Sequence, residues 1–137
     1  MIEFDGIDLI IEKPVDKTNL RRALAASLGV PEERISVIDH VGQYPDASAA
    51  DIVCVESPVL GDFSKLASIQ ARALRLPHDT LMSLVQQLCE LLDSRCLAPD
   101  DGLNPYRMWL LVPGETRLSV SMDPAAMDEG RYILSSG

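Results

Sequence analysis

The 137-residue sequence has few of the residues from which metal and nucleotide sites are built. Its two histidines, His40 and His78, form neither a close pair nor an HExxH motif, so a metal site would need carboxylates or thiols to complete it. None of its eight glycines lies in a GxGxxG or GxxxxGK[ST] motif, which excludes the backbone cradles that hold nucleotide phosphates. We therefore expect neither a bound metal nor a cofactor.

Cysteine is scarce as well. Cys54, Cys89 and Cys96 make an odd number with no CxxC pair, which excludes a disulfide framework and a zinc knuckle. If Cys89 and Cys96 lay on one helix, their spacing would place them about 10 Å apart along its axis, too far for a disulfide. We expect all three cysteines to be small buried apolar side chains.

Positive charge is the next deficit. Twelve Lys and Arg stand against 21 Asp and Glu, a net charge of −9, while 47% of the residues are hydrophobic. This composition predicts a folded domain with an acidic surface, which disfavours direct binding to nucleic acid because that affinity comes from Lys and Arg. The sequence has no apolar run near the roughly 20 residues that span a bilayer and no signal-peptide pattern, so we expect a cytoplasmic protein.

Hydrophobic periodicity predicts one α+β domain over residues 1–137, with two helices packed on a largely antiparallel sheet. The first helix covers residues 18–28, with Asp16 or Thr18 as its N-cap and Gly29 as a left-handed C-cap. The second covers 79–95, with a broad leucine stripe that includes Leu88 and Leu91. We expect strands at residues 7–12, 35–41, 51–56, 67–73, 107–112, 116–121 and 131–134.

Two features of this topology are less constrained by the pattern. The short polar loop 42–50 favours an antiparallel pairing of the strands on either side of it. Residues 67–73 alternate like a half-buried strand, although their alanines also suit a helix. The order of elements overlaps the split βαβ pattern of ferredoxin-like folds, with additional C-terminal strands.

Several carboxylates stand close together in the sequence: Asp5 with Asp8, Asp100 with Asp101, and Asp123 with Asp128 and Glu129. Paired catalytic carboxylates need a cleft that raises one pKa. These groups lie beside turns, so capping, solvation or recognition of a cationic surface explains them better. The neighbours Asp39 and His40 are not expected to pair, because adjacent strand residues point to opposite faces.

The aromatic residues are few, six in all, and two of them lie beside or within the first of the closing strands. Because interfaces favour Trp and Tyr, Tyr106 and Trp109 are candidate anchors for a protein partner. The acidic residues around this hairpin are candidate rim contacts: Asp100, Asp101, Asp128 and Glu129. Core packing is the alternative use of the aromatic side chains.

The segments 96–111 (CLAPDDGLNPYRMWLL) and 127–133 (MDEGRYI) resemble the C-terminal halves of small bacterial toxin-neutralising immunity proteins. The resemblance carries no functional residue to this chain. It implies a cytosolic, often acidic domain that binds a toxin domain, frequently a basic nuclease, and blocks it.

Charge, size and the lack of a completed active site agree with that implication. We expect an acidic, non-catalytic protein that neutralises a basic partner, with a bacterial toxin nuclease as the specific hypothesis. The alternatives are a small-molecule-binding or regulatory α+β module, a small enzyme with an unrecognised site, and an assembly subunit.

Overall fold

The structure is a computed structural model that describes residues 6–43, 50–71, 78–100 and 103–135. Within these ranges the chain forms three helices, α1 (Lys17–Leu28), α2 (His78–Leu92) and α3 (Pro124–Asp128). The strands are β1 (Gly6–Ile11), β2 (Ile35–Ile38), β3 (Ile52–Pro58), β4 (Leu60–Gly61), β5 (Lys65–Ala71), β6 (Cys96–Pro99), β7 (Arg107–Leu111), β8 (Leu118–Ser121) and β9 (Arg131–Tyr132). Two short 3₁₀ turns cover Glu32–Arg34 and Val41–Gln43.

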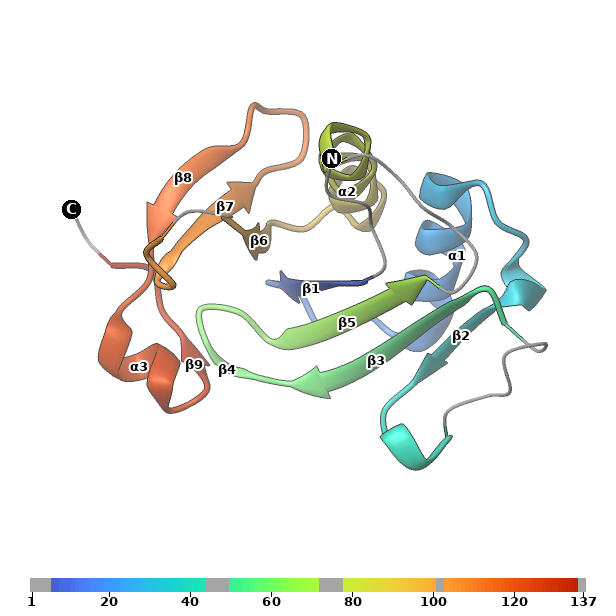
Figure 1. Cartoon of the computed structure of the whole chain (residues 1–137), viewed down its shortest axis with the longest axis horizontal. Coiled ribbons are helices and arrows are strands. Elements are labelled where there is room, and N and C mark those ends of the chain that lie inside the picture. The colour runs from blue at the N-terminus through green and yellow to red at the C-terminus, as the bar shows by residue number, and fades with distance from the viewer. Residues whose placement is uncertain (1–5, 44–49, 72–77, 101–102, 136–137) are drawn as a thin grey trace.

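Seven of these strands form one mixed sheet in the order β2–β3–β5–β1–β6–β7–β8 (Figure 1). Every neighbouring pair is antiparallel except β2 with β3, which is parallel. The predicted α+β class, with helices on a largely antiparallel sheet, is therefore confirmed. The ferredoxin-like arrangement with additional C-terminal strands is not confirmed.

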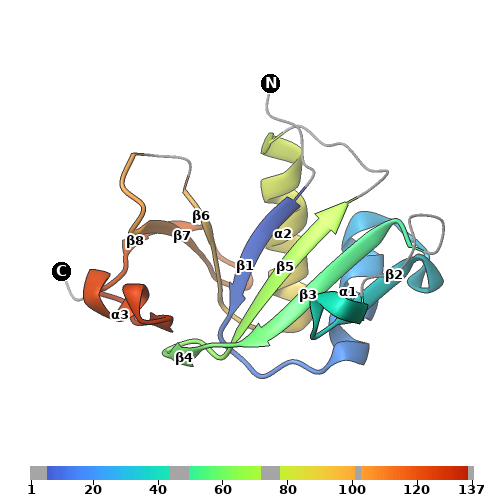
Figure 2. The same ribbon diagram turned by 60° about the horizontal axis from the view of Figure 1, so that its bottom comes forward.

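The sheet consists of two well-paired wings joined at one narrow place. β1 pairs with β5 over six residue pairs but with β6 over only two, Ile10 with Leu97 and Ile11 with Cys96. We call β2, β3, β5 and β1 the first wing, and β6, β7 and β8 the second. From this joint the two wings diverge, as Figures 1 and 2 show.

Helices α1 and α2 cover one face of the sheet, and Figure 2 shows them together behind the strands of the first wing. The Asp16 side chain caps α1 by accepting a hydrogen bond from the Asn19 backbone N–H at 2.7 Å, so Asp16 rather than Thr18 is the cap. Gly29 ends the helix with φ 68°, as expected.

The predicted leucine stripe of α2 is correct in its centre and wrong at its end. Leu81, Val85 and Leu88 are buried against the sheet, whereas Leu91 is 50% exposed. The helix also stops at Leu92, before the predicted limit of residue 95. Asp93 adopts a left-handed conformation with φ 50°, which turns the chain away from the helix axis.

The predicted antiparallel pairing of the second and third strands is wrong. β2 and β3 run parallel, with Ile35 opposite Ile52, because residues 39–51 make a connection long enough for a crossover. The parallel register brings the starts of both strands together. There the Arg34 guanidinium contacts the Asp51 carboxylate through two hydrogen bonds, at 3.0 and 3.3 Å.

Residues 67–71 of the uncertain alternating segment are part of strand β5, while residues 72–77 lie outside the described residues. Three short elements were not predicted: β4, β6 and α3. Each has five residues or fewer, too short for a periodic pattern to show.

Two main clusters of buried side chains lie on the two faces of the sheet. The first fills the space below α1 and α2 and includes Leu9, Ile11 and Leu111. The second lies on the opposite face, where Ile10, Leu97 and Met108 pack with Phe63 and with partly buried residues of the C-terminal segment. On the face away from α1 and α2, β4, α3 and β9 therefore cover one part of the sheet, and a small cluster of Ile38, Ala50 and Val53 is buried over β2 and β3.

Candidate binding cleft

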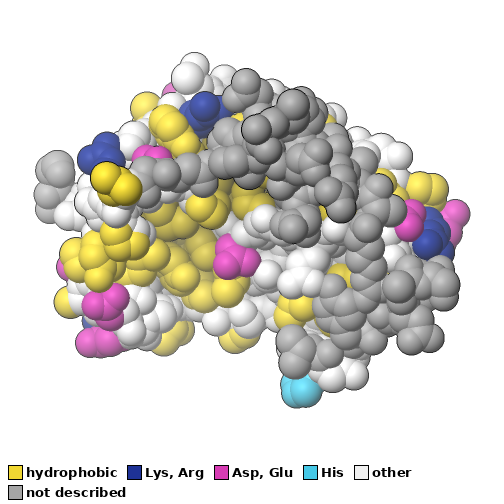
Figure 3. All heavy atoms as spheres, viewed as in Figure 1, with side chains coloured by type: hydrophobic (Ala, Val, Ile, Leu, Met, Phe, Trp, Pro, Cys, Tyr) yellow, Lys and Arg dark blue, Asp and Glu magenta, His cyan; other side chains and the backbone are white. Residues whose placement is uncertain are grey.

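The divergence of the two wings leaves a cleft on the face away from α1 and α2. Its volume is about 310 Å³, at the lower end of the usual range for ligand sites. Figure 3 shows hydrophobic side chains gathered in a hollow between the wings, with acidic side chains in and beside it. The residues that line the cleft are Asp8, Ile10, Leu66, Pro99, Asp100, Pro105, Arg107, Met108, Met127 and Tyr132.

Strand alternation places the floor of the cleft. In β1, Leu9 and Ile11 belong to the core below the helices, so Asp8 and Ile10 occupy the opposite face. Ile10 lies opposite Leu66 of β5 on one side and Leu97 of β6 on the other. An apolar floor therefore crosses the joint between the wings, and Asp8 stands at its edge.

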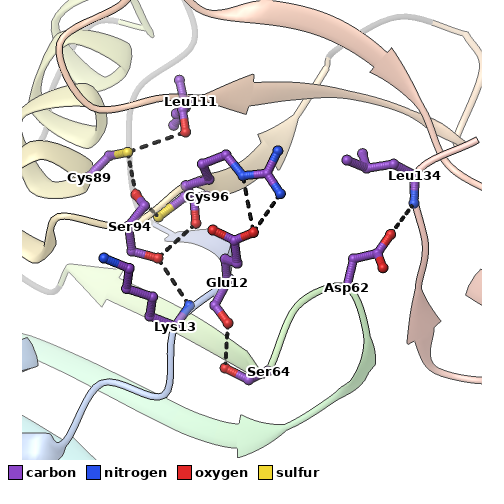
Figure 4. Close-up of polar contacts among 10 residues, drawn as sticks. Glu12, Lys13, Asp62, Ser64, Cys89, Ser94, Cys96, Leu111 and Leu134 are labelled. Carbon is purple, nitrogen blue, oxygen red and sulfur yellow. Dashed lines mark hydrogen bonds and ion pairs between the residues drawn. The ribbon is translucent and has the colours of Figure 1, made fainter.

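The C-terminal segment forms one wall. β9 pairs in parallel with β4, and the Asp62 backbone N–H donates to the Tyr132 carbonyl at 2.8 Å. The Asp62 carboxylate also accepts from the Leu134 N–H at 3.1 Å, as Figure 4 shows. A Cβ atom on Gly61 would lie 2.6 Å from the Tyr132 carbonyl oxygen, so only glycine allows this close approach.

The cleft is electronegative on the side of Asp8. Burial raises the pKa of the Tyr132 phenol, and the negative charge of Asp8 raises it further. In the part of the chain that the structure describes, no side-chain hydrogen bond or ion pair involves Asp8. Its carboxylate is exposed at the edge of an apolar floor, which is the arrangement that a cation with an apolar stem fits.

The predicted partner-binding residues do not share one surface. The Tyr106 hydroxyl donates to the Asp128 carboxylate at 3.3 Å, and the charge of Asp128 raises the pKa of Tyr106. These two residues lie beside the cleft, next in sequence to its lining residues, and Asp100 is itself part of the lining. Glu129 forms an ion pair of 2.9 Å with Arg131.

Trp109, the other predicted anchor, lies on the far side of the sheet. It packs at the margin of the core below α1 and α2, and the Arg117 guanidinium lies 4.6 Å from its ring centre. The acidic residues and this aromatic side chain therefore do not form the expected anchor and rim. The remaining predicted residue, Asp101, lies outside the described residues.

Sequence reasoning noticed Asp8 only as a carboxylate near Asp5 and missed Ile10, Leu66 and Met127 as lining residues. One signal was present: Asp8 is a charged residue between apolar neighbours of a strand. A charge at such a position marks a face of the sheet that stays in contact with solvent.

His40 does not belong to the cleft lining. His40 is exposed, and its Nδ1 accepts a hydrogen bond from the Gly42 N–H at 2.9 Å. Its neighbour Asp39 is bound instead to Lys17 at 3.1 Å, which lowers the pKa of Asp39. Asp39 and His40 directly follow the end of β2. The side chain of His78 lies outside the described part of the chain.

A larger hollow of about 660 Å³ lies between the start of α1 and the end of α2. Its lining is different in charge, because it includes Lys13 and Arg22 with one carboxylate, Asp16. That carboxylate is already used as the cap of α1. The positive charge of its lining disfavours a cationic partner, whereas the negative net charge of the chain favours one.

Among the described residues, no cluster of three or more His, Cys, Asp or Glu side chains could hold a metal ion. No helix in the described ranges combines the length and apolar character needed to cross a bilayer. A search of family models, of curated proteins and of solved structures finds no match to this chain.

Proposed function

We propose that this chain is a non-catalytic binding protein of the cytoplasm that takes a basic protein partner at the cleft. The specific partner we propose is a bacterial toxin nuclease domain, which the chain would neutralise in the manner of an immunity protein. The observation that supports the proposal most directly is the placement of Asp8 at the edge of the apolar floor formed by Ile10, Leu66 and Met108.

Lys and Arg side chains match such a floor. Each carries an apolar stem that can lie on Ile10 and Leu66 and a cationic end that can reach a carboxylate. A second carboxylate, that of Asp128, stands beside the cleft and is held by Tyr106. A basic protein could therefore insert one cationic side chain while its neighbours contact the surrounding acidic residues.

The net charge of −9 contributes to such binding at longer range. A field of one sign steers an oppositely charged partner and raises the association rate, and it also disfavours acidic partners. The acidic surface would therefore raise the association rate and select basic partners, and the cleft would orient the bound partner.

The test begins with capture of the partner from the native cytosol, followed by association kinetics with the purified partner. Two variants with matched charge are compared: Asp8→Asn with Asp128→Asn, and Glu32→Gln with Glu33→Gln. The control pair lies on the exposed 3₁₀ turn next to β2, at the other edge of the sheet. Each double variant removes two negative charges from the same total.

The proposal predicts slower association for both variants at low salt, because both lose charge. Only the cleft variant should also dissociate faster, by about tenfold or more, because it loses contacts in the complex. Equal dissociation rates for the two variants, or an acidic partner, would contradict it. The proposal would also be contradicted if a broad substrate screen found catalytic turnover and if the His40→Ala variant, while folded, lost that turnover.

The volume of the cleft also favours a second candidate, a small cationic ligand. Arginine amide tests this possibility directly by calorimetric titration of the wild type and of Asp8→Asn. Saturable binding that is weakened in Asp8→Asn, together with no protein partner, would favour the small-molecule module.

A further inference from the structure

The structure brings together two of the three cysteines, contrary to what their spacing suggests. Cys89 lies in the last turns of α2, and Cys96 is the first residue of β6. The two are therefore not on one helix. Because α2 ends at Leu92 and Asp93 turns the chain, Cys96 returns beside the helix end, as Figure 4 shows.

One shared hydrogen-bond acceptor, the Ser94 carbonyl, places the two thiols near each other. The Cys89 Sγ donates to the Ser94 carbonyl at 2.7 Å, and the Cys96 Sγ contacts the same oxygen at 3.7 Å (Figure 4). The Cys89 Sγ also lies 3.3 Å from the Leu111 carbonyl, and Leu111 is the ladder partner of Cys96. Both sulfurs therefore occupy one small space between α2, β6 and β7.

We propose that Cys89 and Cys96 are a reversible disulfide site, oxidised by exchange with a low-molecular-weight disulfide such as oxidised glutathione. The thiolate of Cys89 attacks the reagent and releases one glutathione thiolate, which leaves glutathione bonded to Cys89. Cys96 then loses its proton and attacks the Cys89 sulfur, which releases the second glutathione thiolate. The protein loses two electrons and two protons, and the reagent gains them as two thiols.

The environments of the two sulfurs support this order of events. The hydrogen bond from the Cys96 thiol lowers the pKa of Cys89, whereas the same bond and burial raise the pKa of Cys96. Cys89 is thus the better first nucleophile. Cys54 differs from both, because burial in β3 raises its pKa to about 12. It is an internal control for a thiol that should not react.

Access to the pair depends on the turn that follows α2, because both sulfurs are fully buried. The Ser94 hydroxyl holds this turn in place through two hydrogen bonds. It accepts one from the Lys13 N–H at 3.1 Å and donates one to the Arg95 carbonyl at 3.0 Å. Local opening of a helix end needs less free energy than global unfolding. We expect opening of this turn to limit the rate of oxidation.

The experiment exposes the folded protein to oxidised glutathione, quenches it with acid and counts the thiols in denaturant. The thiol count should fall from three to one, and peptide mapping should join Cys89 to Cys96. A dithiol reductant should restore the original count. In Cys54→Ala both remaining thiols should disappear, whereas Cys89→Ser and Cys96→Ser should form no internal disulfide.

A parallel sample in urea shows that the reagent and the time of exposure suffice to oxidise accessible thiols. If that sample is oxidised while the folded protein keeps all three thiols, the proposal is wrong. A disulfide that includes Cys54, or a stable glutathione adduct without ring closure, would also overturn it. These outcomes come from the wild-type protein, so they do not depend on the folding of any variant.

Discussion

The Lys65 ammonium group lies 2.8 Å from the Glu56 carboxylate, in an ion pair whose side chains are 16% and 11% exposed. Lys65 also donates to the Val15 carbonyl, so the pair ties β5 and β3 to the segment that precedes α1. Breaking a buried pair costs more than replacing it, because a single removal leaves a charge without a partner.

Lys65→Met should accordingly lower the free energy of unfolding by about 3 kcal/mol or more. The double variant Glu56→Leu with Lys65→Met should recover most of this loss, because both charges are then absent. Urea denaturation of the wild type, the two single variants and the double variant measures the coupling. Single losses that simply add in the double variant would show that the two groups do not interact.

The α2 helix offers a matched pair of leucines for a second prediction. Leu88 is 2% exposed in the core, whereas Leu91 is 50% exposed on the same helix. Leu88→Ala should cost about 2–5 kcal/mol of unfolding free energy, and Leu91→Ala should stay within about 0.5 kcal/mol. Chemical denaturation of both variants provides the measurement. Similar losses at the two positions would mean that the described helix orientation is incorrect.

Gly61 and Gly114 provide a test of how β9 is held. Both have left-handed φ values, 102° and 75°, but only a Cβ on Gly61 meets another group, the Tyr132 carbonyl. Gly114→Ala should cost about 1–2 kcal/mol, the price of a left-handed side chain. Gly61→Ala should cost more and should displace Tyr132 from the cleft, which amide chemical shifts of residues 131–132 would report. If the two substitutions lowered the free energy of unfolding equally, the predicted clash between a Cβ on Gly61 and the Tyr132 carbonyl would be wrong.

The ion pair of Asp51 with Arg34 should make the free energy of unfolding depend on pH. The hydrogen bonds from Arg34 lower the pKa of Asp51 below its ordinary value of 3.8, so the folded state favours the charged carboxylate. Its contribution is fully present above that value and is lost as the pH falls through the lower folded pKa. The stability gap between wild type and Asp51→Asn should therefore narrow in acid. A gap that is constant from neutral pH to pH 2 would contradict this assignment.

The two described tyrosines should respond to different carboxylates. Asp8→Asn should lower the pKa of Tyr132 while leaving it above the ordinary 10.0, because burial remains. Asp128→Asn should instead lower the pKa of Tyr106, which Asp128 raises by its charge and hydrogen bond. Tyrosine ring resonances followed through an alkaline NMR titration separate the two sites. A response of both tyrosines to one substitution would contradict the described separation.

Periodicity predicted the elements that bury a regular face. The helix that begins after Asp16 and the hairpin of β7 and β8 were predicted at nearly their described bounds, because caps, turns and alternation agree there. β6 was missed because Cys96–Pro99 is four residues long and has apolar residues on both faces. The parallel pairing of β2 and β3 was missed because a polar loop does not specify the direction in which the chain leaves it.

The cleft was out of reach for a different reason. Alternation in β1 could place Asp8 away from the helices, but the other wall comes from Met108 and Tyr132, far along the chain. Their approach depends on the sheet order and on the early end of the β1–β6 ladder. Trp109 was assigned to a binding surface by residue type, although its register in β7 places it on the helix side.

The two wings of the sheet can change their angle most easily at the two-pair ladder of Ile10 with Leu97 and Ile11 with Cys96. Strands β5 and β7 extend away from it, so a small change of angle there becomes a larger change in the distance between their far ends. The backbone supplies few hydrogen bonds to oppose such a change. Next to the ladder, the Glu12 N–H donates to the Arg95 carbonyl at 3.0 Å and the Arg95 guanidinium pairs with the Glu12 carboxylate. The angle therefore depends on these contacts and on the packing on either face: the Cys89 thiol against β7 on one face, and Phe63 with Met122 on the other.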